Sequence, residues 1–387
     1  MFLTLFSIVY RGFYFVFYFF KYLMSFLHLA LPLGIDIGLA GIAAFYLTRL
    51  RPPSSENVVS IFGSKPGQES EKKNKNVQCI AHRGAGFDAP ENTLQAFKYC
   101  VERDCKFIEF DVRTCMDGKL VLLHDKGLQR IAESSIADVQ NFEWEKIKDI
   151  DVAANHPNRN QFKEVRLCLL EDALDYLIEK NVRFIIDVKG DDKKVIDGIL
   201  KTFSERPVLY KQAVVTTFNP LVLYQIRRND PEIVGALSYR PYCFSAQDYD
   251  AENGPMTNFP LQSLLKLLDF IHSGLWRTTA KWCNVTAVLL HKDIVSPQEV
   301  AYWRNRGVFC CGWCVNRPLE KLYWRGVLKT PYLANTLVGE PSIWLLLQFN
   351  SPFLGRQRKL TAGCTKKYNL RICKKYRISK RMGCTTL

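Results

Sequence analysis

Eight short apolar runs, each followed by polar residues, constrain the fold of this chain more than any other feature. They cover residues 77–81, 107–112, 119–123, 182–188, 212–217, 233–238, 286–290 and 307–313. Helices are expected between many of them, over 92–103, 170–179, 193–204, 219–228 and 297–306. Strands that alternate with helices predict an α/β fold, and eight strands predict a (β/α)8 TIM barrel. The second and third runs are joined too tightly for a helix, so we expect that unit to be irregular.

Residues 1–50 are expected to form a membrane anchor of one or two transmembrane helices. Residues 2–20 are apolar and aromatic apart from Arg11, and the run from 22 to 47 exceeds the ~20 residues that span a bilayer. A cleaved signal peptide is the competing interpretation, but the apolar stretch is too long and has no obvious small-residue cleavage site. Basic residues lie at both ends, so they do not set the orientation.

The rest of the chain divides by composition. Residues 51–76 are rich in Pro, Ser, Gly, Lys and Asn, which predicts a solvated linker before a catalytic domain over 77–340. The net charge is +15, but residues 356–387 hold eleven basic and no acidic residues within a basic tail, 341–387. The catalytic region is therefore nearly neutral, which argues against a nucleic-acid partner. The sequence predicts no particular protein partner.

Residue types that are common in active sites gather at the ends of the apolar runs. His82 and Arg83 follow the first run, Glu109 and Asp111 end the second, His124 follows the third, Asp187 and Lys189 end the fourth, and Trp313 ends the last. Active sites of TIM barrels lie at the carboxyl ends of the strands. We therefore expect one catalytic rim at this end of the barrel.

The acidic residues of this rim predict a metal site. Glu109 and Asp111 are two apart on a strand, so both side chains point to the same side. Two inward carboxylates repel each other unless a cation or a proton joins them. A divalent cation with oxygen ligands is the economical solution, and Asp187 can add a third ligand. The alternative is a solvent-facing acidic pair.

The basic residues suit an anionic substrate. Arg83 and Lys189 supply positive charge for a phosphate group. His82 and His124 suit general acid and base catalysis on an ester oxygen. A single histidine is usually structural, but two at neighbouring strand ends beside an acidic pair favour catalysis.

Five ordered motifs together resemble the glycerophosphodiester phosphodiesterase family. They are His82-Arg83-Gly84, Pro90-Glu91-Asn92-Thr93, Glu109-x-Asp111, His124-Asp125 and Asp187-x-Lys189. The resemblance runs from about 77 to 338. Two further matches, residues 153–156 and 238–241, resemble the membrane-bound branch that acts on glycerophosphoinositol and related lipids.

The resemblance implies a role for each matching residue. His82 and His124 would be the acid–base pair, and Glu109, Asp111 and Asp187 would hold a divalent cation, Mg²⁺ or else Ca²⁺. Arg83 and Lys189 would hold the phosphate, Glu91 would orient the site, and Trp313 would pack against the substrate or the core. Many relatives carry Glu in place of Asp187. Residues 334–336 stand where many relatives have a Thr-Asp pair.

The implied reaction is the metal-dependent hydrolysis of a glycerophosphodiester. The substrate would be glycerophosphoinositol, a glycerophospho-N-acylethanolamine or a lysophospholipid. The products would be glycerol phosphate or lysophosphatidate and an alcohol, with the glycerol 2-hydroxyl as an internal nucleophile. Two alternatives stay open: a catalytically weak, membrane-anchored lipid-binding barrel, and a phospholipase of the sphingomyelinase D type.

An insertion of about 241–283 separates the sixth and seventh runs, far longer than an ordinary loop of a barrel. Its apolar stripe consists of Leu261, Leu264, Leu265, Leu268, Ile271 and Leu275. Its polar face consists of Gln262, Lys266, Asp269 and Ser273. These faces predict an amphipathic helix, which either packs on the barrel or forms a lid that contacts membrane lipids. Trp276 and Trp282 suit such an interface.

Localisation rests on weak signals. Asn284-Val285-Thr286 is a glycosylation sequon, and a used sequon would place the barrel in a lumen or outside the cell. The basic tail points the other way, towards anionic cytosolic lipids. We expect an integral membrane protein with a luminal or extracellular catalytic domain.

Overall fold

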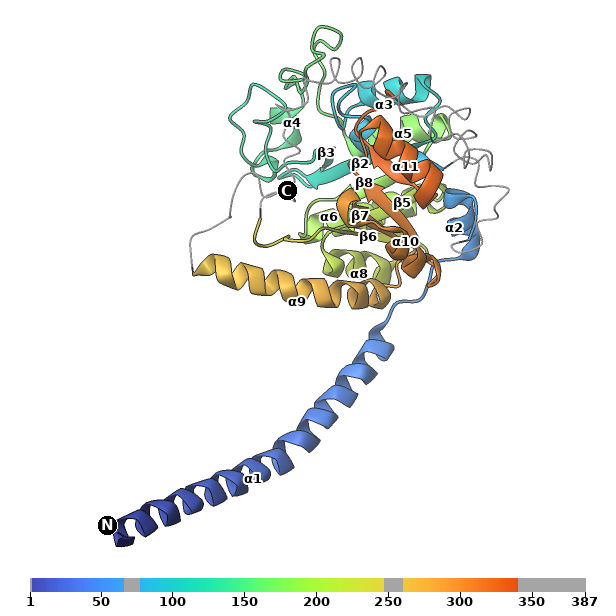
Figure 1. Ribbon diagram of the computed structural model, residues 1–387. Coiled ribbons are helices and arrows are strands. Elements are labelled where there is room, and N and C mark those ends of the chain that lie inside the picture. Colours follow the sequence, from blue (N-terminus) through green and yellow to red (C-terminus); the bar gives the residue numbers. More distant parts are fainter. Residues whose placement is uncertain (1, 66–76, 247–259, 340–387) are drawn as a thin grey trace, which may run out of the picture. The chain divides into compact units, whose positions relative to one another are not determined.

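A computed structural model describes residues 2–65, 77–246 and 260–339 of the chain (Figure 1). The chain divides into two compact units, Met1–Arg49 and Leu50–Leu387. The first unit contains one helix of 47 residues, α1 (Phe2–Thr48). None of the helices in these ranges combines the length and the hydropathy of a bilayer-spanning segment, so the membrane anchor stays a prediction. The predicted basic tail lies outside the described residues.

Eight parallel strands close into a barrel in the second unit, so the predicted TIM barrel is confirmed. They are β1 (Cys79–Ala81), β2 (Phe107–Thr114), β4 (Arg183–Val188), β5 (Ala213–Thr217), β6 (Val234–Tyr239), β7 (Ala287–His291), β8 (Phe309–Trp313) and β9 (Tyr332–Ala334). Closure comes from β1, which pairs in parallel with β9 on one side and with β2 on the other.

One of the eight predicted barrel strands is wrong. The run 119–123 forms β3 (Leu120–Leu122), which pairs antiparallel with β2 and stands outside the ring. The tight turn at Gly118, with φ of 82°, allows only an antiparallel neighbour, because parallel strands need a long crossover. The eighth barrel strand is instead β9, which the sequence did not predict.

Helices cover the outside of the barrel (Figure 1). They are α3 (Leu94–Glu102), α4 (Trp144–Ile147), α5 (Leu170–Glu179), α6 (Lys193–Glu205), α7 (Leu209–Gln212), α8 (Pro220–Asn229), α9 (Leu261–Trp282), α10 (Pro297–Arg304) and α11 (Pro318–Tyr323). The five helices predicted between the runs are present within a few residues of the expected bounds. The predicted insertion contains α9, and residues 247–259 of it lie outside the described ranges.

Strand alternation separates an outer core from the barrel interior. On β2, Ile108, Phe110 and Val112 point outward and pack with the surrounding helices. Phe107 points inward, where it meets apolar residues of the other strands. Because side chains alternate, Glu109 and Asp111 share the inner face with Phe107. The register of one strand therefore directs both carboxylates into the barrel.

Residues 55–62 of the predicted linker instead form a helix, α2 (Ser55–Phe62). Its Ile61 is fully buried among the interior residues of the barrel, and its Phe62 stacks on Phe309 with ring centroids 4.2 Å apart. Phe309 begins β8, so α2 closes the amino ends of the strands. The linker prediction is wrong here because polar composition hid a short amphipathic turn. The opposite, carboxyl end of the barrel remains open for a site.

Candidate active site

Three buried carboxylates meet at the carboxyl ends of two neighbouring strands. Asp111 of β2 and Asp187 of β4 are register partners, and Glu109 precedes Asp111 on the same inner face. One oxygen from each of the three lies within 4.8 Å of the others. Like charges directly opposite each other in a sheet are destabilising, so this cluster requires a proton or a cation.

The proton affinities of these groups show the same excess of negative charge. Burial raises the pKa of Glu109 well above its usual value, and the charges of Asp111 and Asp187 raise it further. Burial also raises the pKa of Asp187 to about 6. Burial opposes ionisation of Asp111 too, but Lys189 and other nearby positive charges outweigh it and hold this pKa well below its usual range.

The cluster has the donors that a hard divalent cation needs. Asp111 Oδ1 and Asp187 Oδ1 are buried, and no described group makes a hydrogen bond to either. Lys189 Nζ donates to Asp187 Oδ2 at 2.7 Å and lies 3.1 Å from Asp111 Oδ1 without the alignment of a hydrogen bond. An all-oxygen set with open lone pairs suits Mg²⁺ or Ca²⁺. The three predicted ligands therefore fit a cation. Lys189, which was expected to bind the substrate phosphate, contacts two of these carboxylates instead.

The first motif forms a sharp turn directly after β1. Arg83 has φ of 53° and Gly84 has φ of 73°, and both lie in the left-handed region. A Cβ atom on Gly84 would lie 2.9 Å from side-chain carbons of Ala96 and Phe97, so only glycine fits. This turn aims the backbone N–H of Arg83 at Glu109 Oε2, to which it donates at 2.9 Å. A left-handed arginine costs roughly 1–2 kcal/mol, which marks a functional constraint.

His82 is held by an amide. Its Nδ1 makes a hydrogen bond with Oδ1 of Asn335, the residue that follows β9. An amide oxygen only accepts, so Nδ1 carries the proton and Nε2 keeps its lone pair. His82 Nε2 lies 3.7 Å from Glu109 Oε2, beside the carboxylate cluster. Asn335 was noted in the sequence as a departure from the family, but its role was not predicted.

His124 is held by a carboxylate, at the end of a chain of charged residues. Its Nδ1 lies 2.7 Å from Asp125 Oδ1, and Asp125 Oδ2 accepts from Arg130 Nε at 2.6 Å. Both terminal nitrogens of Arg130 donate to Glu91, at 3.0 and 2.6 Å. Arg83 also donates to Glu91, at 3.2 Å. Glu91 thus links Arg83, the neighbour of His82, to the Asp125–Arg130 pair that positions His124.

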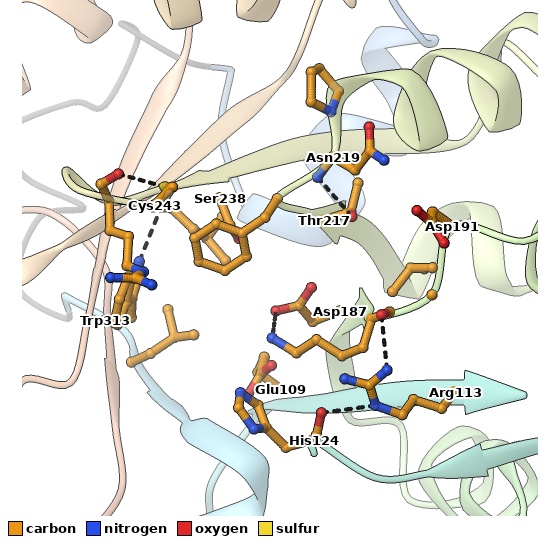
Figure 2. A pocket seen from close by; sticks show the side chains of 18 of the residues that line it. Glu109, Arg113, His124, Asp187, Asp191, Thr217, Asn219, Ser238, Cys243 and Trp313 are labelled. Atoms are coloured by element: carbon orange, nitrogen blue, oxygen red, sulfur yellow. Dashed lines mark hydrogen bonds and ion pairs between the residues drawn. The ribbon is translucent and has the colours of Figure 1, made fainter. Parts of the chain in front are cut away.

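Two more residues that position the site were missed in the sequence. Asn92 stands at the start of the helix expected over 92–103, and it donates to Asp111 Oδ2 at 2.9 Å and accepts from the Asp111 N–H at 3.0 Å. Arg113 donates to the backbone carbonyls of His124, at 2.9 Å, and Lys189, at 3.1 Å (Figure 2). Arg113 continues the two-residue period of Glu109 and Asp111, a signal from which its inward direction was predictable.

Both histidines are neutral in this environment. Burial lowers the pKa of His82 to about 3, and the charge of Arg83 lowers it further. The same two causes, in the same order, lower the pKa of His124 to about 4. Each ring therefore has a lone pair on Nε2 at neutral pH.

A single cavity of about 670 Å³ joins these groups to the surface (Figure 2). Its polar lining includes His82, Arg83, Glu109, His124, Asp187 and Lys189, and its aromatic and aliphatic lining includes Phe218, Leu221, Phe244 and Trp313. The indole N–H of Trp313 donates to a backbone carbonyl at 3.3 Å, and its ring packs edge-on against that of Phe218. Trp313 therefore belongs to both the core and the cavity wall. The volume suits a small ligand or the head of a larger one.

The fold and this site define a class of enzyme, the hydrolases of phosphate esters built on a TIM barrel. The chain belongs to the glycerophosphoryl diester phosphodiesterase family, whose sequence profile matches residues 82–332. The matched region contains all nine predicted site residues.

Curated relatives and solved structures agree with this assignment. The chain is 32% identical over 273 residues to glycerophosphodiester phosphodiesterase 1 of Homo sapiens, which covers 69% of this chain and 80% of that protein. The fold resembles a glycerophosphodiester phosphodiesterase of Parabacteroides distasonis, with a TM-score of 0.51 and 17% identity over 71% of this chain and 99% of that one. It also resembles a phosphodiesterase of Oleispira antarctica in complex with sn-glycerol-3-phosphate, with a TM-score of 0.50 and 18% identity over 70% and 96% of the two chains.

Proposed function

We propose that this chain hydrolyses glycerophosphodiesters with the help of a divalent cation, with Mg²⁺ as the natural ion. The observation that carries the proposal is the set of three buried carboxylates beside two neutral histidines in one cavity. The carboxylates fit a cation, and the histidines can exchange protons with two ester oxygens. The complex of a distant relative with sn-glycerol-3-phosphate supports glycerol phosphate as a product.

The two histidines have different partners, which suggests different tasks. His124 is neutral in this environment, so it must take up a proton at Nε2 before it can donate one to the leaving alcohol. The negative Asp125 stabilises that protonated form, which makes His124 the better general acid of the two. The neutral amide of Asn335 gives no such stabilisation, so His82 is the better general base for the attacking hydroxyl. A bound cation would polarise the phosphoryl oxygen and stabilise the charge that develops in the transition state.

The basic residues would complete the phosphate site. Arg83 lies 3.4 Å from Asp111 Oδ2, and Lys189 contacts Asp187, so both already lie at the carboxylate cluster. A cation bound by the carboxylates would compete with Lys189 for their charge. Lys189 would then turn its ammonium group to the substrate phosphate, as the family pattern implies.

The wall of the cavity favours substrates with an apolar part. Phe218, Leu221 and Phe244 line the cavity and are also partly open to solvent. A free glycerophosphoinositol has no group for such a surface, but an acyl chain does. We therefore propose lysophospholipids and glycerophospho-N-acylethanolamines as the preferred substrates, with glycerophosphoinositol as a substrate of lower affinity.

A substrate panel tests the proposal. Purified full-length protein would be assayed on glycerophosphoinositol, a lysophospholipid and a glycerophospho-N-acylethanolamine, each with Mg²⁺, Ca²⁺ and a chelator. The proposal expects hydrolysis with Mg²⁺, none with chelator, and none for His82→Ala under any condition. Sphingomyelin would be added as a fourth substrate, and activity on it without activity on the glycerophosphodiesters would indicate a sphingomyelinase D type enzyme instead. Binding without hydrolysis would indicate a lipid-binding barrel.

We further propose that the enzyme is an integral membrane protein with a luminal or extracellular catalytic unit. Helix α1 supports this, because many of its aromatic side chains between Phe13 and Phe26 are exposed. The sequon offers a test of the side. Asn284 donates its amide to the Leu50 carbonyl at 2.9 Å, so glycosylation would have to precede this contact. A glycosidase-sensitive mass shift that Asn284→Gln abolishes would support the luminal side. Digestion of the unit by protease added outside sealed vesicles, whose cytosolic face is outward, would contradict it.

A further inference from the structure

Helix α9 packs on the barrel through one narrow face, in which Asp269, Trp276 and Ala280 are buried. Asp269, one of the four residues of the predicted polar face, accepts hydrogen bonds at 3.0 Å from the backbone N–H groups of Phe244 and Ser245. Trp276 was expected to suit an interface, but it is buried and stacks on Tyr239 with ring centroids 4.3 Å apart. The physical reason is that the loop after β6 needs acceptors for its backbone donors, and Asp269 supplies them.

The remaining tryptophan of the insertion also packs within the catalytic unit. Trp282 stacks on Tyr224 of α8, with ring centroids 4.0 Å apart. Figure 1 shows α9 lying along the outside of the barrel beside α8. The two tryptophans thus fix the carboxyl-terminal half of α9 to the barrel, and they leave its other face outward.

The outward face of α9 is apolar. Leu264, Leu267, Ile271 and Leu275 follow helical spacing and are between 45% and 54% exposed. Phe270, on the margin of this face, is 76% exposed. A contiguous group of large apolar side chains on a surface marks a place where a partner binds. We call these five residues the α9 outer face.

Charge identifies the partner. Lys266, Arg277 and Lys281 lie along one margin of the α9 outer face, and the one acidic residue of the helix, Asp269, is buried. Arg277 also pairs with Glu299 at 2.7 Å. A two-fold dimer in which the two α9 helices run antiparallel would bring each basic margin against a copy of itself, which disfavours that arrangement. An apolar face with a basic margin is instead typical of a helix that lies in the interface of an anionic bilayer.

The α9 outer face borders the mouth of the active-site cavity. His272 of α9 and Phe244 both line the cavity, and their rings meet edge to face with centroids 5.6 Å apart. Leu268 and Leu275 are four and three residues from His272, so they are its neighbours on the helix surface. Across the mouth, Leu221 is also exposed. Apolar side chains therefore continue from the helix to the entrance of the site.

We propose that α9 docks on an anionic lipid bilayer through its outer face and thereby sets the mouth of the cavity against the membrane surface. This contact is separate from any anchor in the first 50 residues. It also does not depend on the reaction proposed above, because it rests on the exposure and charge of α9 alone.

Photocrosslinking in the full-length protein tests the proposal and identifies the occupant. Benzoylphenylalanine would replace Leu267 in one protein and Leu319 in another, because Leu319 of α11 is 73% exposed but lies away from α9. Each protein would be reconstituted in phosphatidylcholine vesicles with and without phosphatidylserine. We expect lipid adducts at position 267 to exceed those at position 319 by about tenfold in the anionic vesicles.

Charge reversal supplies the second arm. Phosphatidylserine should no longer increase the adduct yield in the double variant Lys266→Glu, Lys281→Glu. In the anionic vesicles we expect the yield at position 267 to fall by about fivefold for each reversed charge. Equal lipid adducts at both positions would overturn the proposal, as would crosslinks to a second copy of the chain, crosslinks to another protein, or no adducts at position 267. Folding of each protein is checked by its thermal transition, so that loss of structure is distinguished from loss of docking.

Discussion

The rim of the barrel and helix α9 distribute polar and apolar groups in opposite ways. At the rim, charged side chains are bonded to one another, as in the chain from the buried His124 through the more exposed Asp125 and Arg130 to Glu91. On α9, Leu264 and Leu267 are exposed. Folding therefore pairs most charged groups of the rim with one another, whereas the large side chains of the α9 outer face stay exposed among the residues that the structure describes. The comparison suggests that the barrel alone positions the groups for the reaction. Entry of the substrate into the cavity would depend instead on what the α9 outer face binds.

The largest effect is expected from removing one charge at the rim. Glu109→Gln keeps the shape of the side chain but removes a cation ligand, so activity should fall by about a thousandfold or more. Burial already raises the pKa of Glu109, so the neutral amide should leave the melting temperature unchanged or higher. Thermal unfolding beside initial rates checks both. Retained activity would remove Glu109 from the cation site.

Breaking the positioning chain should have the next largest effect. Arg130 contacts both Glu91 and Asp125, but it does not line the cavity. Arg130→Ala should lower kcat by about 10–100-fold, the range seen when groups that orient a ligand or catalyst are lost, and leave KM nearly unchanged. Arg159→Ala is the matched control, because Arg159 pairs with the exposed Glu133 at 3.3 Å. A loss that falls on KM instead of kcat would place Arg130 at the substrate.

Protons should compete with the cation at the rim. Asp187 has a pKa of about 6 without a cation, so it is ionised above this pH and protonated below it. A cation must then displace the proton, and its apparent Kd should rise by about tenfold for each pH unit below this value. Calorimetric Mg²⁺ titrations on either side of this pH measure the effect. A constant Kd would mean that Asp187 does not bind the cation.

The smallest effect is expected on the outer side of α9, and the buried side of the same helix is the comparison. Leu267→Gln should change stability by no more than about 0.5 kcal/mol, because its side chain is exposed among the described residues. Trp276→Ala should destabilise the unit by about 3–5 kcal/mol, because the indole is buried against Tyr239. Chemical denaturation of the two variants compares the two sides of one helix. Similar losses in both would show that the outer face packs within the protein.

The sequence predicted most of the barrel because parallel strands that are buried on both faces consist of consecutive apolar residues. The register of β2 was also predictable, since alternation alone directs Glu109 and Asp111 inward. The antiparallel β3 was not, because a short apolar run looks the same inside the ring or beside it. β9 was not predicted, although it is no shorter than the predicted β1.

The predicted site residues lie together, yet their contacts depend on distant segments. Asn335 and His82 are far apart in the sequence and meet only when the barrel closes, so no local pattern reveals their contact. The positioning role of Asn92 was not predicted, because an asparagine at the expected start of a helix fits a helix cap equally well. On α9 the pattern predicted an amphipathic helix correctly, but periodicity does not say which face a protein buries. Asp269 decided that orientation through backbone donors of a different segment.

The most direct test of the separation between reaction and access is one kinetic comparison, and it rests on the proposed function. Values of kcat/KM would be measured for the triple variant Leu264→Gln, Leu267→Gln, Ile271→Gln and for His82→Ala, on lysophospholipid in anionic vesicles and on soluble glycerophosphoinositol. We expect the triple variant to lose about tenfold on the vesicle substrate and nothing on the soluble one, and His82→Ala to lose activity on both. Equal losses of the triple variant on both substrates, or none on either, would contradict the account.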